Sequence, residues 1–144
     1  MTAEELMDSL IQRLGLTDLE SEGPGRWRIV FDADVAVDFE IENGSGIRLE
    51  TVLGPLPEDE YWAETAVRAV LQRNLTQLNG VAQNVVFLHS DRPILSISRT
   101  ENAENSDSES FAACVEDFVN AAEAWLEFLA VEAAPTPPGL AMRL

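Results

Sequence analysis

The side chains most suited to covalent chemistry in this sequence are its only histidine, His89, and its only cysteine, Cys114. A hydroxyl or thiol nucleophile usually needs a nearby base to activate it. His89 stands between two predicted strands, beside Ser90, Asp91 and Pro93, and this position is typical of an exposed turn residue. Cys114 has apolar neighbours at helical spacing, where a thiol packs as a small hydrophobe. We therefore predict that the protein is not an enzyme.

Metal and phosphate sites are not indicated by the sequence either. A zinc site commonly draws three or four ligands from cysteine and histidine, and the chain has one of each. The carboxylates of Asp32, Asp34, Asp38 and Glu40 lack the spacing and the glycine of a calcium loop, so we interpret them as a solvated strand face. The glycines within 43–46 precede a predicted strand, whereas a phosphate-binding loop opens a helix. We predict no bound metal and no cofactor.

The charge of the chain narrows the classes of partner. Its 144 residues include 26 Asp and Glu and 9 basic residues, which gives a net charge of −17. This charge repels the phosphate backbone of nucleic acid, so nucleic acid is not expected as a partner. One cysteine allows no intramolecular disulfide, and the N-terminal residues lack the basic and apolar regions of a secretory signal. No stretch approaches the roughly 20 apolar residues that span a bilayer. We expect a soluble, cytoplasmic protein.

The elements that must position these side chains begin with a helix and a three-stranded meander. A capping-box pattern opens a predicted amphipathic helix over 2–14. Apolar residues then alternate with polar ones over 27–31 and 35–42, as in half-buried strands. The hairpin signal at 43–46 leads into a third predicted strand over 47–53.

A second group of elements follows a predicted break in the sheet at 54–57, where glycine and two prolines occur. The elements expected after it are a helix over about 58–79, strands over 85–88 and 94–97, a solvated loop over 101–109, and a long helix over 111–129 capped by Ser108 or Ser110. Residues 1–132 are thus predicted to form a single α+β domain, helix-strand-strand-strand-helix-strand-strand-helix, with a twisted antiparallel sheet. Residues 133–144 are predicted to form a proline-rich flexible tail.

The predicted helices carry more apolar surface than one thin layer over five strands should bury. The helix over 58–79 combines a face of small and polar residues with an apolar stripe formed by Val67, Leu71, Leu75 and Leu78. We predict that this stripe contributes to the symmetric interface of a homodimer. The alternative is that all three helices bury their apolar residues in one monomeric core.

Several features of the chain together resemble one family. Residues 1–16 are similar to that family's first helix with its terminating glycine, and residues 54–57 resemble its junction between sheet and second helix. Small size, strong acidity, the predicted element order and the long amphipathic helix over 111–129 complete the pattern, which covers about residues 2–132. The sequence thus resembles the class I chaperones of bacterial type III secretion, the family that includes the Tir-chaperone (CesT-like) type.

This resemblance implies a homodimer that binds the N-terminal segment of a secretion effector in an extended, non-globular state, without ATP. It also places the effector contacts on the first helix and first strands, where the candidates are Leu6, Leu10, Leu14, Trp27 and Ile29. If these residues form the core instead, their substitution unfolds the protein. The alternative function is that of a cytoplasmic adaptor or regulator of the same fold, similar to the YbjN-like proteins, that binds a folded partner.

Overall fold

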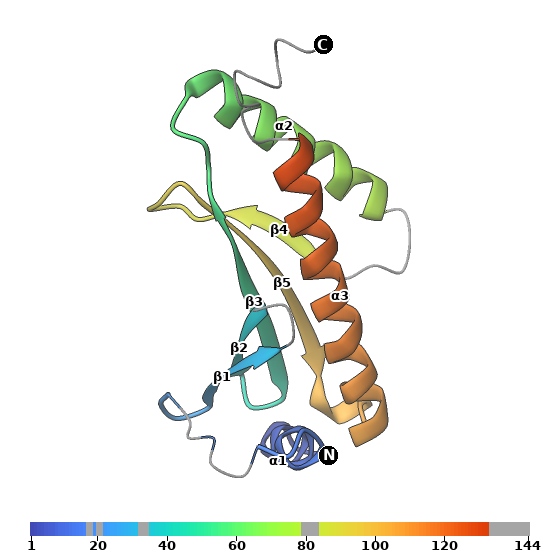
Figure 1. Ribbon diagram of the computed structural model, residues 1–144. Helices are drawn as coiled ribbons and strands as arrows, with labels where there is room; N and C mark the ends of the chain where they lie inside the picture. Colours follow the sequence, from blue (N-terminus) through green and yellow to red (C-terminus); the bar gives the residue numbers. More distant parts are fainter. Residues whose placement is uncertain (17–18, 20–21, 32–34, 79–83, 133–144) are drawn as a thin grey trace.

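The computed structural model describes the chain except for residues 17–18, 20–21, 32–34, 79–83 and 133–144 (Figure 1). The predicted α+β class and the predicted order of helices and strands are confirmed, with one short 3₁₀ helix in addition. The elements are α1 (Ala3–Arg13), β1 (Arg26–Phe31), β2 (Val35–Glu42), β3 (Gly46–Pro55), α2 (Glu60–Leu78), β4 (Val85–Leu88), β5 (Ile94–Asn102), η2 (Ala103–Asn105) and α3 (Ser108–Glu132). Among the described residues, no helix is long and apolar enough to cross a membrane.

The five strands form one antiparallel sheet in the order β1-β2-β3-β5-β4. Helix α3 lies along one face of this sheet, α1 lies near the start of α3, and α2 lies near its end (Figure 1). The edge strands are β1 and β4, at opposite sides of the sheet. The sheet and α3 therefore form two layers, with α1 and α2 at the two ends.

The core lies between the sheet and α3. Alternate residues of the central strands face it, including Val37, Phe39, Ile47 and Leu49, which are all buried. Helix α3 contributes its apolar stripe to the same cluster; its buried members include Phe111, Val115, Phe118, Ala122 and Trp125. The period-two and helical patterns of the sequence therefore meet in one hydrophobic core.

Helix α1 begins as its capping pattern predicts. The backbone N–H of Glu5 donates to Oγ1 of Thr2 at 3.1 Å, which satisfies one of the free N–H groups at the helix start. Ala3, Leu6, Met7 and Leu10 then face the core from one side of the helix. Gly15 follows with φ of +72°, a backbone conformation that favours glycine and ends the helix.

Strand β3 is longer than predicted, because the sheet does not break at Gly54. Gly54 pairs with Leu95 and Pro55 with Ile94, after an irregularity between Val52 and Gly54. Strand β2 pairs with β3 only as far as Glu50, so the end of β3 has one unpaired side. A proline without an N–H is tolerated there because no ladder hydrogen bond needs it.

The segment predicted as a loop over 101–109 is also more ordered than expected. Strand β5 continues to Asn102, and η2 follows at once. Helix α3 then begins after Asp107: its carboxylate accepts from the N–H of Ser110 at 2.8 Å, and Ser110 Oγ accepts from the N–H of Asp107 at 3.0 Å. The cap of α3 is therefore Asp107, and neither Ser108 nor Ser110 as predicted.

Candidate binding groove

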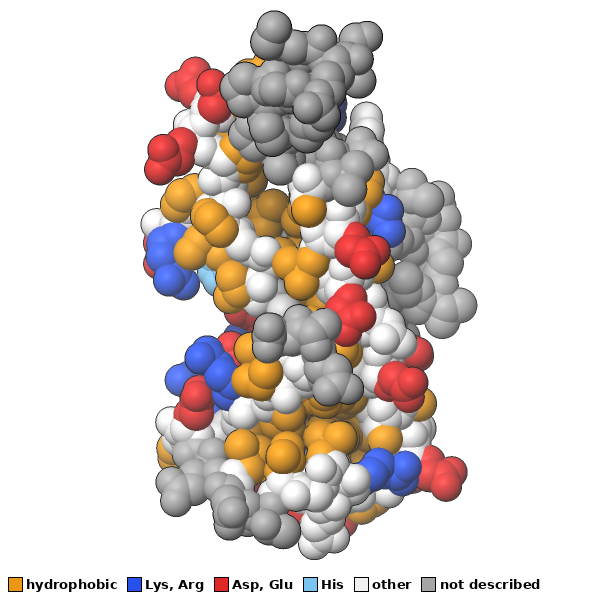
Figure 2. Space-filling model, viewed as in Figure 1, with side chains coloured by type: hydrophobic (Ala, Val, Ile, Leu, Met, Phe, Trp, Pro, Cys, Tyr) orange, Lys and Arg blue, Asp and Glu red, His pale blue; other side chains and the backbone are white. Residues whose placement is uncertain are grey.

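A groove of about 590 Å³ opens between α1, the end of β1 and the first half of α3. Its apolar lining comes from Leu10 of α1, Leu14 at the C-cap of that helix, Phe31 of β1, and Val115 and Val119 of α3. Figure 2 shows apolar side chains gathered in a hollow beside α3, with acidic side chains along that helix. This volume lies within the range of ligand-binding clefts, and the walls of the groove come from three different elements.

The groove exists because α1 crosses only the end of the two-layer core. Leu10 is 4% exposed and belongs to the core, whereas Leu14, one turn later, is 40% exposed. The small residues Ala112 and Ala113 of α3 line the same groove, so the helix leaves space opposite α1. An apolar hollow of this kind on a charged protein indicates a binding surface.

Strand β1 borders the groove and is an edge strand of the sheet. At its start, Arg26 pairs with Gly23 and Glu22, and beyond Arg26 no described residue pairs with its outer side. The N–H of Ile41 donates to the carbonyl of Gly25, so by the antiparallel alternation Trp27, Ile29 and Phe31 direct their backbone groups toward β2. Arg28 and Val30 therefore direct their N–H and C=O groups outward. Such groups can pair with an added strand.

The structure places the five predicted contact residues in two environments. Leu6, Leu10 and Ile29 are buried in the core, at 0%, 4% and 2% exposure. Leu14 is exposed and Trp27 is partly buried against the core, so these two can meet a ligand from solvent. Whether any of the five contacts an effector stays a prediction.

Sequence reasoning misses the contribution of α3 to this groove. Helical periodicity assigns Val115 and Val119 to the core, and both are indeed almost fully buried while they also line the groove. The alternation over 27–31 identifies Phe31 only as a strand residue. The sequence signal for the groove is the pair Ala112 and Ala113, because two small side chains make α3 thinner beside its apolar stripe.

Helix α2 shows two faces among its described side chains. Ala66 and Val70 are buried, and the guanidinium of Arg73 lies 5.2 Å from the ring centre of Trp125 and 4.5 Å from that of Phe128 on α3. A neighbouring face carries Val67, which is partly buried, and Leu71, which is 58% exposed. Of the predicted dimer stripe, the side chains of Leu75 and Leu78 lie outside the described part. The homodimer stays a prediction.

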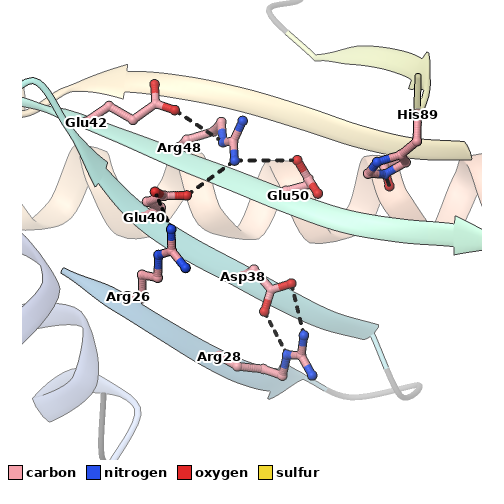
Figure 3. Close-up of polar contacts among 9 residues, drawn as sticks. Arg26, Arg28, Asp38, Glu40, Glu42, Arg48, Glu50 and His89 are labelled. Atoms are coloured by element: carbon pink, nitrogen blue, oxygen red, sulfur yellow. Dashed lines mark hydrogen bonds and ion pairs between the residues drawn. The ribbon is translucent and has the colours of Figure 1, made fainter. Parts of the chain in front are cut away.

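The sheet face opposite α3 carries a network of ion pairs over β1, β2 and β3 (Figure 3). Arg28 donates twice to Asp38, at 2.7 and 3.2 Å, and the pKa of this guanidinium is raised because the Asp38 carboxylate accepts its hydrogen bonds. Arg48 lies between Glu40, Glu42 and Glu50, at 3.3 to 3.8 Å. Asp38 and Glu40 thus lie on a solvated strand face as predicted, while Asp32 and Asp34 lie outside the described residues.

The two candidates for covalent chemistry are not placed for it. His89 is partly buried, and not the exposed turn residue that was predicted; its Nε2 lies 2.9 Å from Oγ of Ser96, which is fully buried and so closed to a substrate. Cys114 is buried as expected, and burial raises the pKa of its thiol to about 12. Within the described part of the chain, no group of three or more His, Cys, Asp or Glu side chains is arranged to hold a metal ion.

Comparison with known proteins gives one family and several similar structures. The model of the Tir chaperone protein (CesT) family matches residues 5–126. No curated protein sequence matches the chain.

The similar structures share the fold at low sequence identity. The Yersinia pestis type III secretion chaperone SycH, in complex with a stable fragment of YscM2, matches with a TM-score of 0.61, 16% identity, and coverage of 83% of this chain and 96% of that one. The HopA1–SchA chaperone–effector complex matches with a TM-score of 0.69, 14% identity, and coverage of 86% and 92%. The ExsC–ExsE complex matches with a TM-score of 0.68, 17% identity, and coverage of 92% and 94%.

Proposed function

The chain belongs to the Tir chaperone protein (CesT) family, and we propose that it binds the N-terminal segment of a type III secretion effector in an extended, non-globular state. The observation that carries this proposal is the apolar groove between α1 and α3 beside the edge strand β1. An edge strand and an adjacent apolar groove suit an extended segment, because the first pairs its backbone and the second takes its side chains. A segment held in this way stays soluble and competent for secretion.

The binding mode follows from the geometry of β1. An effector strand placed beside Arg28 and Val30 would accept from and donate to their outward backbone groups. Its alternate side chains would then point to the side of the sheet that α3 covers, where Phe31 and Leu14 border the groove. Backbone pairing would supply affinity for any extended chain, and the groove would supply selectivity.

The proposed activity is binding alone. It needs no ATP, metal or nucleophile, because holding a segment extended requires only that the complex be more stable than the segment's own collapsed states. We propose that this activity belongs to the cytoplasm, before secretion, and that the protein is not an enzyme. We also propose a homodimer through the exposed face of α2 that includes Leu71, which a monomer would leave in water.

The test is co-expression of the full chain with candidate effectors, followed by limited proteolysis of the purified complex. We expect an N-terminal effector segment to be protected from protease. Within this segment, amide protons outside the strand that pairs with β1 should exchange as fast as in an unfolded chain. A matched control is the same effector without that segment, which should not co-purify. Binding of the folded effector core instead would favour the YbjN-like adaptor and contradict the proposal.

A further inference from the structure

We propose that the groove selects extended segments that carry Lys or Arg beside their apolar side chains, with the basic residues facing α3. This inference rests on the proposed function and names the kind of segment that the groove accepts. Its basis is the lining of the groove, which has an apolar floor. Along α3, Glu109, Glu116 and Glu123 form an acidic rim on one side of the groove.

The three glutamates form a row along the groove. They are spaced seven residues apart on α3, and seven residues make almost two full helical turns, so the side chains lie on one side at steps of about 10 Å. An extended segment that runs along the row advances about 3.3 Å per residue, so one step of the row corresponds to about three residues of that segment. Because only every second side chain points to the same side, lysine and arginine residues two or four positions apart face the row together, and their side chains are long enough to reach its carboxylates.

The carboxylates of the rim differ from those of the sheet in their partners. None of the three glutamates has an ion pair within the part of the chain that the structure describes. On the outer face of the sheet, by contrast, Asp38, Glu40, Glu42 and Glu50 each pair with an arginine. The negative charge of the rim is therefore free to act on a ligand.

The opposite wall gives the groove a direction. Arg13 lines the groove from α1, whereas the row lies on α3, and Arg13 likewise forms no ion pair with a described residue. A segment with basic residues toward α3 and acidic residues toward α1 would meet complementary charge on both walls. The reverse orientation would place like charges together on both, which disfavours it.

The occupant can be tested before any effector is identified, using a library of random 12-residue peptides displayed on phage. The library is selected on the full chain and on two variants with equal charge change. In the first variant, Glu116→Gln and Glu123→Gln remove two carboxylates of the rim. In the control, Asp117→Asn and Glu127→Gln remove two carboxylates of the same helix that do not line the groove. Thermal melts establish that both variants fold as the parent does.

We expect the parent and the control to select peptides with apolar residues and with Lys or Arg two or four positions apart. The rim variant should lose the preference for basic residues and keep the apolar one. A selected peptide should bind the rim variant about 2-fold to 25-fold more weakly than the parent, because each exposed ion pair contributes modestly. The control should bind within about 2-fold of the parent, and the difference should shrink in high salt.

The outcomes separate this inference from the proposed function. Apolar peptides selected without basic residues, or equal loss of binding in the rim variant and the control, would overturn the charge selection while leaving the groove as a binding site. No enrichment of any peptide on the parent would contradict the proposed function itself. A basic preference that persists in the rim variant would place the charge recognition elsewhere and overturn the inference.

Discussion

Leu10 of α1 and Leu14 at its C-cap are one helical turn apart and both line the groove, and their truncation should separate a buried side chain from an exposed one. Leu10 is 4% exposed, so Leu10→Ala removes fully buried atoms and should cost about 2 to 5 kcal/mol of stability. Leu14 is 40% exposed, which leaves about three fifths of its surface buried and bounds the cost of Leu14→Ala at about 1 to 2 kcal/mol. For a chain of this length the melting temperature falls about 3 °C per kcal/mol. We therefore expect falls of about 6 to 15 °C for Leu10→Ala and at most about 6 °C for Leu14→Ala.

Binding measurements test the contribution of Leu14 to the groove. Leu14→Ala removes an apolar anchor of the groove and should weaken binding of the effector's N-terminal segment about tenfold, measured by fluorescence anisotropy at a temperature where both variants are folded. Leu88→Ala is the matched control, because Leu88 is similarly exposed, at 46%, and lies at the far edge strand β4. If Leu14→Ala binds as tightly as the control, or melts as low as Leu10→Ala, the groove beside α1 is not the effector site.

Other parts of the chain offer four more tests. Leu71→Asp should halve the mass seen by light scattering from twice 15.8 kDa to 15.8 kDa, because the charge would be desolvated in the α2 interface; a parent of 15.8 kDa would contradict the dimer. The pKa of Asp107 is lowered because its carboxylate accepts a hydrogen bond from the backbone N–H of Ser110. The resulting stabilisation is fully present above the ordinary pKa of about 4 and is lost as the pH falls below it. The difference in melting temperature between Asp107→Ala and the parent should therefore shrink from pH 7 to pH 3. Cys114, with its pKa raised to about 12 by burial, should react with a disulfide reagent at pH 8 only after unfolding in urea; prompt reaction of the native protein would show that the helix opens. Removal of the chain from Pro135 onward should lower the melting temperature by less than about 5 °C, and a larger fall would show that this segment contributes to the fold.

The sequence predicts the parts of this fold that depend on local chemistry. Thr2 caps α1 because a hydroxyl can accept the N–H of Glu5, and this contact depends on no distant part of the chain. The meander follows from period-two alternation and from Asn43, whose positive φ of 51° suits the predicted hairpin. These patterns predict the elements because each of them favours one backbone conformation that does not depend on distant residues.

The end of β3 differs from its prediction because it depends on neighbours that local patterns do not reveal. Glycine and proline at 54–55 usually end a strand. Here β5 is long enough to pair with them, and the N–H of Leu56 still donates to the carbonyl of Pro93 at 2.7 Å beyond the strand. The proline leaves no hydrogen bond of the sheet unmade, because β2 ends before it and β5 continues alongside it. The lengths of β2 and β5 are set by tertiary packing.

The groove is predicted only in part for a related reason. Helical periodicity identifies an apolar stripe on α3 but not which element covers each turn of it. Phe118 is completely buried, whereas Val115 and Val119 reach the groove where α1 ends. A core turn and a groove turn therefore have the same sequence pattern, and only the place where the neighbouring helix stops distinguishes them.

The acidic rim also bears on how an apolar groove can stay open in the free protein. An exposed apolar hollow beside an edge strand would favour association of two copies through the same surface. Steps of about 10 Å between Glu109, Glu116 and Glu123 are close to the screening length of physiological salt, so their fields overlap along the whole groove. Two such grooves brought together would repel one another, while a basic segment would neutralise the rim as it fills the hollow. The same charges would then oppose self-association and admit the effector, and Glu116→Gln with Glu123→Gln should increase aggregation of the free protein at low salt.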